Sequence, residues 1–241
     1  ITLLSILFLI SNIMATSIQV NKKSVAELLK TWGKNKFVIP EYQRSYAREE
    51  EQCQTLWTDI SHFFEQKKED TYFLWTIVSY LNEQWEQEII DGQQRITTLF
   101  LLLRAVYKKL EQMTENTSVV GLMQQIEPCI WDVNNITKRV EDFSTIHIKS
   151  LVIADADNQT FANILKTWTI QEKAKDNYSL NYLFFQDCID EYSQNNPITF
   201  YEFFVKLLEN CILLPIECDN QETALTIFST LNDRWLPLSD A

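Results

Sequence analysis

The sequence predicts an α+β fold in which a small α/β unit precedes a mainly helical second half. The chain has 241 residues and a hydrophobic content of 46%, which is enough to bury a substantial core. Apolar runs of strand length lie mostly within the first 113 residues, whereas beyond them most apolar residues recur at helical spacing. No internal repeat or Gly/Ser-rich linker separates the halves, so we expect them to pack together.

The first unit is expected to span residues 14–113. Ser24 and Glu27 form a capping box before an apolar helical stripe that Gly33 ends. A strand at 37–39 stops at Pro40, because proline lacks the N–H that a strand ladder needs. The remaining elements are a helix at 49–66, two antiparallel strands at 72–81 and 85–90 with a short connector, and a helix at 96–110.

The second half, residues 114–241, opens with a polar, mixed region at 114–143 whose helical signals are weak. Aromatic runs at 182–185 and 200–204 stand at helical spacing among acidic neighbours, which is typical of core rather than of base-stacking platforms. The pattern predicts a strand at 145–153, helices at 157–168, 177–192 and 199–209, a buried strand at 211–217 and a closing helix at 221–231.

A polar turn, DGQQR at residues 91–95, lies between the second predicted strand and the long apolar helix. Free N–H groups and the positive end of the helix dipole converge at such a turn, so it suits a phosphate. Arg95 adds a permanently charged, forked donor, and Asp91 is an acceptor suited to a hydrated Mg²⁺ ion or a water. The alternative is a simple N-cap by Asp91 beside a solvated Arg95.

A second motif, FVIPEYQRSY at residues 37–46, places Gln43 and Arg44 in a loop beside two tyrosines. Taken together, IPEYQRSY and IIDGQQRITTL resemble the N-terminal domain family of GmrSD-type restriction endonucleases, a branch of the ParB and sulfiredoxin-like superfamily. DGQQR followed by two threonines is a specific signal, and the first motif has the expected order and spacing. The segment ALTIFSTLNDRWLPLS at 224–239 resembles the family's closing stretch, so the resemblance runs from about Ser17 to the last residue.

The resemblance implies a bacterial anti-phage defence protein that binds and hydrolyses a nucleoside triphosphate with Mg²⁺ during restriction of modified DNA. Asp91, Gln94 and Arg95 would be catalytic, with Asp91 holding Mg²⁺ or orienting the attacking water and the arginines offsetting phosphate charge. For Thr97 and Thr98, capping of the helix is an alternative to phosphate binding. The nucleotide-binding residues implied are Gln43, Arg44, Gly92, Gln93, Gln94, Arg95, Thr97 and Thr98.

The same resemblance implies partners. DNA would be reached through the full-length protein or a partner, and an HNH-type nuclease domain or subunit would cut it, because this chain shows no nuclease motif. Homo-oligomers are left open, and a cytoplasmic protein without a membrane partner is expected. Two other functions stay open: a ParB-like nucleotide switch that does not usefully hydrolyse, and a degenerate copy.

Three residues depart from the family pattern. Trp75 and Trp235 stand where relatives usually have a small residue, commonly Gly, and Arg48 stands where they usually have Trp. An indole cannot supply the positive φ or close backbone approach of glycine, so Trp75 could distort the strand beside the pocket and Trp235 the turn after the last helix. Either both indoles are tolerated at partly exposed positions, or the chain is a decayed or altered copy.

The net charge of −12 is unevenly distributed. Residues 1–110 hold 13 basic and 13 acidic side chains, whereas residues 111–241 hold 8 and 20. Binding to the DNA backbone depends on Lys and Arg, so we expect any DNA contact in the first half and a protein partner on the second. The alternative is a solvated acidic face that aids solubility.

Cysteine and histidine exclude several chemistries. The five cysteines have irregular spacing and no CxxC, which indicates reduced, mostly buried thiols, and no cysteine adjoins the DGQQR turn to support sulfiredoxin-like chemistry. His62 and His147 lack ligand-spaced neighbours, so neither predicts a metal site or a nuclease base, and both are expected at the surface or partly buried.

The two ends of the chain also invite a prediction. Residues 1–13 are apolar and uncharged but fit neither a signal peptide nor a membrane span, so they are interpreted as a leader or a misjudged start before Met14. At the other end, the family resemblance implies truncation before a C-terminal nuclease or helical domain.

Overall fold

The computed structural model describes residues 19–33, 36–66, 71–152, 157–170 and 174–233. Within these ranges, eight helices and one mixed seven-stranded sheet confirm the predicted α+β class. The strands are β1 (Gln19–Val20), β2 (Lys23–Ser24), β3 (Phe37–Ile39), β4 (Tyr72–Leu81), β5 (Gln87–Asp91), β6 (Ile148–Ser150) and β7 (Cys211–Cys218). The helices are α2 (Val25–Gly33), α3 (Glu50–Gln66), α4 (Gln93–Gln112), α5 (Thr117–Ile130), α6 (Asn158–Thr167), α7 (Asn177–Asn195), α8 (Phe200–Asn210) and α9 (Gln221–Asp233).

The sheet joins strands from both ends of the described chain. Its order is β1-β7-β4-β5-β3-β6, with β2 also pairing β7. The β4–β5 pair is antiparallel, as predicted from its short connector. The long β4–β7 pair is parallel and runs from Tyr72 opposite Cys211 to Tyr80 opposite Cys218. A strand from the second half thus lies beside the longest strand of the first, and the two halves share one sheet.

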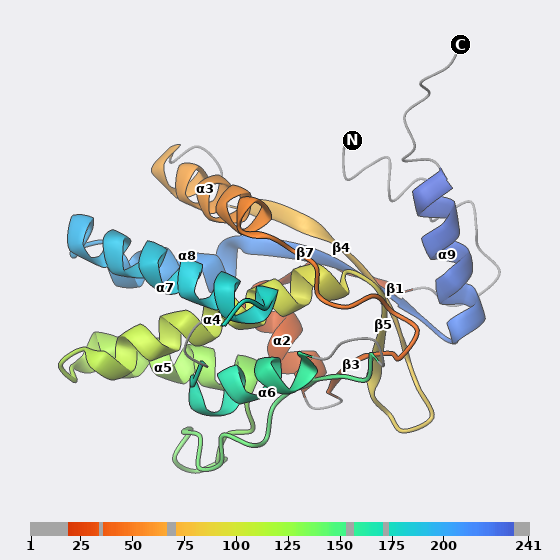
Figure 1. The fold of residues 1–241 in the computed structure, drawn as a ribbon, viewed down its shortest axis with the longest axis horizontal. Coiled ribbons are helices and arrows are strands. Elements are labelled where there is room, and N and C mark those ends of the chain that lie inside the picture. Colours follow the sequence, from red (N-terminus) through yellow and green to blue (C-terminus); the bar gives the residue numbers. More distant parts are fainter. Residues whose placement is uncertain (1–18, 34–35, 67–70, 153–156, 171–173, 234–241) are drawn as a thin grey trace.

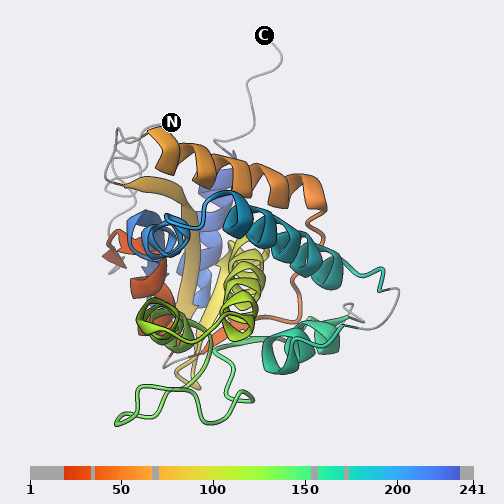
Figure 2. The ribbon, with the colours of Figure 1, turned by 90° about the vertical axis from the view of Figure 1, so that its left-hand side faces the viewer.

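Helices cover both faces of this sheet unequally. Figure 1 shows α9 on one side and the other helices on the opposite side, and Figure 2 shows the same arrangement turned by 90°. Successive strand residues point to opposite faces, so Ile77 and Leu213 join the large core under the main helical layer. Their neighbours Val78 and Leu214 join the small core under α9. Strands β4 and β7 are therefore apolar on both faces, which explains their continuous hydrophobic runs.

The region expected to be polar and weakly helical contains the regular helix α5. Asn116 caps it, because its side-chain oxygen accepts hydrogen bonds from the N–H groups of Ser118 and Val119 at 2.9 and 3.0 Å. Gly121 and Pro128 inside the helix weaken the helical signal in the sequence. Conversely, the strand expected at 145–153 is only the three-residue β6, preceded by an isolated bridge between Trp131 and Ile146.

Trp75 is buried in the main core and only 8% exposed, so the suggestion of a partly exposed position is wrong for this indole. Its Nε1 has no hydrogen-bond partner. The β4–β7 pairing shifts register between Phe73 and Trp75, where one extra residue of β4 opposes β7. The strand therefore carries the indole inward with a local irregularity. Trp235 and residues 1–13 lie outside the described residues.

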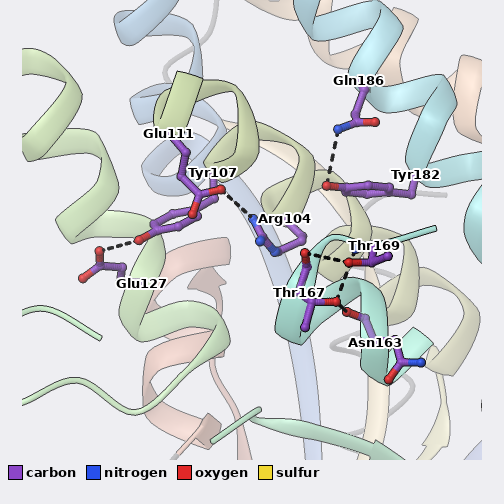
Figure 3. A network of polar contacts seen from close by, with 9 residues as sticks. All are labelled: Arg104, Tyr107, Glu111, Glu127, Asn163, Thr167, Thr169, Tyr182 and Gln186. Carbon is purple, nitrogen blue, oxygen red and sulfur yellow. Dashed lines mark hydrogen bonds and ion pairs between the residues drawn. The ribbon is translucent and has the colours of Figure 1, made fainter. Parts of the chain in front are cut away.

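A buried arginine anchors the helical layer. The Arg104 side chain is 1% exposed, and its guanidinium lies 5.5 Å from the Tyr107 ring centroid and 5.4 Å from that of Trp131. Its Nη1 is 3.6 Å from a Glu111 carboxylate oxygen, as Figure 3 shows. Tyr107 in turn donates to the buried carboxylate of Glu127 at 2.8 Å. We call this set of five residues the Arg104 cluster.

No helix among the described residues is both long enough and apolar enough to cross a membrane.

Candidate functional site

The DGQQR turn is formed by a glycine that no other residue type could replace without strain. Gly92 is the N-cap of α4 with φ of 99°, and no side chain caps the helix. A Cβ at this position would stand 3.2 Å from Cγ1 of Ile77. The Gly92 carbonyl accepts from the N–H groups of Arg95 and Ile96 at 3.0 and 2.9 Å. The alternative of an Asp91 N-cap is therefore wrong, because the chain turns one residue later.

Asp91 is instead the last residue of β5. Its backbone pairs with Val78 of β4, and the register shift that follows in β4 marks a bulge in the ladder. Its carboxylate accepts from Arg95 Nη2 at 2.9 Å, one helical turn ahead. The two side chains are 30% and 26% exposed, so the pair is open to solvent and to a ligand.

The structure brings the two sequence motifs together through three glutamine amides. Gln94 donates to the Ser45 carbonyl at 3.0 Å and accepts from the Ala47 N–H at 2.8 Å, so one side chain clamps the loop of the first motif. Gln93 donates to the side-chain oxygen of Gln43 at 2.8 Å. Gln43 donates to the Ile90 carbonyl at 2.9 Å. The loop and the turn therefore form one hydrogen-bonded unit, and Gln94 serves as a clamp within it.

The threonines of the second motif are buried on the core side of α4. Thr97 and Thr98 are 1% and 0% exposed and do not line the cavity described below. The Thr98 hydroxyl donates to the Gln94 carbonyl at 2.8 Å and lies 2.9 Å from the Tyr46 hydroxyl. Neither hydroxyl caps α4. Burial raises the pKa of Tyr46, which keeps its phenol neutral. Thr98 thus pins the first-motif loop to α4 from inside.

A cavity of about 710 Å³ opens between the loop and the turn, within the size range of small-molecule sites. Its charged lining consists of three guanidinium groups, those of Arg44, Arg48 and Arg95, and one carboxylate, that of Asp91. The cavity therefore has an excess of positive charge in a protein whose net charge is −12. The rest of its lining is Gln43, Ala47, Gln52, Ile90, Gly92, Gln93, Gln94 and Phe228.

Arg48 lies among these cations, and its pKa reflects both burial and neighbouring charge. Burial lowers the pKa of Arg48, and the like charges of Arg95 and Arg44 lower it further. A guanidinium remains charged throughout the physiological range, so loss of a proton does not relieve the repulsion between these groups. An anion in the cavity would relieve it. The arrangement thus favours a ligand with several negative charges.

Metal binding by the protein alone has little support. Across the part of the chain that the structure describes, no group of three or more His, Cys, Asp or Glu side chains could hold a metal ion. Asp91 is the one carboxylate of the cavity, and Mg²⁺ commonly takes one or two carboxylates plus phosphates and waters. The donor set therefore fits Mg²⁺ that arrives with a polyphosphate.

Cysteine and histidine lie apart from the cavity lining. The five thiols are free and mostly buried, as predicted, and burial raises their pKa, that of Cys211 to about 12. His147 was expected at the surface or partly buried, but it is 5% exposed and therefore buried, and its Nε2 lies 3.0 Å from Asp132. Burial lowers the pKa of its imidazole.

Five lining residues were not predicted as part of a nucleotide site: Ala47, Arg48, Gln52, Ile90 and Phe228. Arg48 was noted only as a departure from the family, although it follows the first motif by two residues. Gln52 lies one turn further, in α3, and its spacing from Arg48 is a helical signal that could have found it. Phe228 comes from α9, and no local pattern links it to the pocket.

Fold and site together define a mixed α+β domain with a pocket that lies at a helix N-terminus and has an excess of positive charge. The family can be stated as well. A model of the family described as GmrSD restriction endonuclease, N-terminal domain, matches residues 25–241, and the chain belongs to that family. Membership makes it part of a restriction system. No curated protein matches the chain.

Proposed function

We propose that this domain binds and hydrolyses a nucleoside triphosphate with Mg²⁺, and that it does so to regulate DNA restriction. The observation that carries the proposal is the charge of the cavity, where three guanidinium groups face one carboxylate at an uncapped helix N-terminus. Phosphoryl transfer needs positioning and charge stabilisation more than covalent chemistry from the protein. The cations and the helix N-terminus of the pocket would supply both.

Each residue would have a defined part. The N–H groups of the Gly92 turn and the dipole of α4 would hold a phosphate. Arg95 would exchange its bond to Asp91 for a phosphate oxygen, since an exposed ion pair of this kind contributes little to stability and is easily broken. Asp91, once released, would orient the attacking water or hold Mg²⁺, which would neutralise charge on the phosphates.

The glutamines of the second motif would act mainly through position. Gln94 already uses its side-chain oxygen and one N–H on the backbone of the first motif, so its part is to hold the loop rather than to touch phosphate. Gln93 and Gln43 bond to each other at the rim of the cavity. They would bind the ribose or base of the nucleotide.

The chemistry on DNA would belong elsewhere. The described residues lack a cluster of His, Cys, Asp and Glu suited to a nuclease metal, and the second half of the chain is acidic. We therefore propose that an HNH-type nuclease domain or subunit cuts DNA, and that the acidic half contacts protein rather than DNA.

Phosphate release by the 241-residue chain, offered each of four nucleoside triphosphates with Mg²⁺, tests the proposal. Asp91→Ala and Arg95→Ala should each slow release at least about 100-fold, because each removes a group that acts on the transition state. The melting temperature should hardly change, since the exposed pair they break contributes about 0–1 kcal/mol.

Glu83→Ala is the matched control for Asp91→Ala. Glu83 is exposed in the turn between β4 and β5, so its substitution removes an equal negative charge outside the cavity lining. Binding without release by the wild type would favour the ParB-like switch. A folded protein that binds none of the four would overturn the proposal and favour a degenerate copy. Trp75→Gly should then restore binding if the indole is the cause.

A further inference from the structure

Arg48 is the cavity residue whose charge is least accounted for. It follows the first motif, at the start of the turn into α3, and lines the cavity with Arg44 and Arg95. Among the described residues, its guanidinium forms neither an ion pair nor a hydrogen bond, whereas Arg95 is paired with Asp91. Arg48 is also partly buried, so water screens its charge less than it screens that of exposed Arg44.

The backbone of Arg48 is held firmly from the other side. Its carbonyl accepts a hydrogen bond from Asn181 Nδ2 at 2.8 Å, and the same Nδ2 donates to the Tyr46 hydroxyl at 3.0 Å. Tyr46 stacks on Tyr178 with ring centroids 4.7 Å apart. Helix α7 therefore fixes the backbone at residue 48, and a positioned cation loses less freedom when it binds an anion.

The number of cationic groups indicates the ligand. Three guanidinium groups line the cavity, and its one carboxylate is already paired with Arg95. A monophosphate carries at most about two negative charges near neutral pH, which the α4 N-terminus and Arg95 could bind without help. A triphosphate chain is longer and more highly charged, and it alone would bring an anion to each guanidinium.

We infer that Arg48 binds the phosphate chain directly and makes the site selective for triphosphates over shorter nucleotides. The inference rests on the proposed nucleotide binding and adds to it a residue that lies outside both motifs. Arg48 would form charge-assisted hydrogen bonds to phosphates beyond those held by the Gly92 turn. Selectivity for the triphosphate would follow from those added contacts.

Binding measured by calorimetry on the whole chain tests this. The ligands are the mono-, di- and non-hydrolysable triphosphate forms of one nucleoside, each with Mg²⁺, and inorganic tripolyphosphate, which separates phosphate contacts from contacts to the base. Arg48→Gln should weaken triphosphate and tripolyphosphate binding about tenfold or more, and the monophosphate less than about threefold. Arg48→Lys should recover part of the loss, because it keeps the charge but not the fork.

Lys138→Gln is the control for net charge, since Lys138 is exposed on the loop after α5 and away from the cavity lining. It should leave all four affinities unchanged, and the melting temperature of each variant verifies folding. Equal weakening of mono- and triphosphate by Arg48→Gln, or no weakening, would overturn the inference. The proposed function would survive that result if Arg95→Ala still abolished binding, whereas failure of the wild type to bind any nucleotide would overturn both.

Discussion

Helix α4 carries arginines into two regions that treat positive charge in opposite ways. At its start, Arg95 shares a cavity with Arg44 and Arg48, and the one carboxylate there, that of Asp91, pairs with Arg95. Within the same helix, Arg104 is sealed between the rings of Tyr107 and Trp131 and faces Glu111. The protein surrounds the cation of the second region with its own side chains, whereas in the first region three cations face one carboxylate.

The difference separates charged side chains that would act in ligand binding from charged side chains that act in folding. In the Arg104 cluster, the carboxylate of Glu111 and two aromatic faces offset the cation, and Tyr107 links it to the buried carboxylate of Glu127, so changes there should affect the free energy of unfolding. In the cavity, burial lowers the pKa of Arg48, and the like charges of Arg95 and Arg44 lower it further. Changes there should affect ligand binding and leave folding almost unchanged.

The largest expected effect breaks the structural region at its buried carboxylate. The Glu127 side chain is 1% exposed and accepts from Tyr107, Arg139 and the Val140 N–H at 2.8, 2.8 and 3.1 Å. Glu127→Ala would strand these donors, so chemical denaturation should show a loss of about 3 kcal/mol or more. Glu127→Gln, which keeps an acceptor, should lose less.

Glu115→Ala is the control for that measurement, because Glu115 is exposed and its substitution removes an equal negative charge. A loss within about 0.5 kcal/mol for Glu127→Ala would mean that the cluster is not structural, and the comparison between the two regions would fail.

An intermediate effect is expected where fold and cavity meet. Gly92→Ala places a side chain at φ of 99° and 3.2 Å from Ile77, so it should cost about 1–2 kcal/mol of unfolding free energy and weaken nucleotide binding as well. Gly121→Ala in α5 is the matched control, because its Cβ would meet nothing within 4 Å. That change should stabilise the protein by up to about 1 kcal/mol. Equal effects of the two substitutions would contradict the strain at Gly92.

The smallest expected effect sharpens the contrast between the arginines. Nε and Nη1 of Arg104 have no hydrogen-bond partner, so its main contribution is packing against two rings. Arg104→Met should change the unfolding free energy by less than about 1 kcal/mol and leave nucleotide affinity unchanged, whereas Arg104→Ala should cost about 2–4 kcal/mol. A large loss for the methionine variant would show that the charge itself is required.

Local signals in the sequence predicted the elements well and their arrangement poorly. Strand β4 has the bounds that its apolar run indicates, and Gly92 lies at the predicted turn. Helix α5 was missed because Gly121 and Pro128 interrupt its pattern, although its Asn116 cap was readable. The position of β7 beside β4 was not predicted, because the partner of a parallel strand depends on packing rather than on spacing.

The same limit applies to the site. Both motifs were found, and the Gln94 and Gln93 bonds that join them follow from residues the sequence singled out. Thr97 and Thr98 resemble phosphate donors by position along the chain, but their side of α4 faces the core. Phe228 could not be predicted, since only the fold brings α9 to the cavity.

The place of β7 in the sheet has a consequence for how the protein is made. The neighbour of β4 on one side is separated from it by well over a hundred residues of chain, and Phe228 of the cavity follows later still. Loop closure over such a span is slow, and a nascent chain must wait for its last third before the sheet can close. Until then the edge of β4 that will pair with β7 has unpaired backbone groups, to which other strands can pair incorrectly. A ribosome-bound chain therefore has neither a finished sheet nor a complete cavity until synthesis has passed α9.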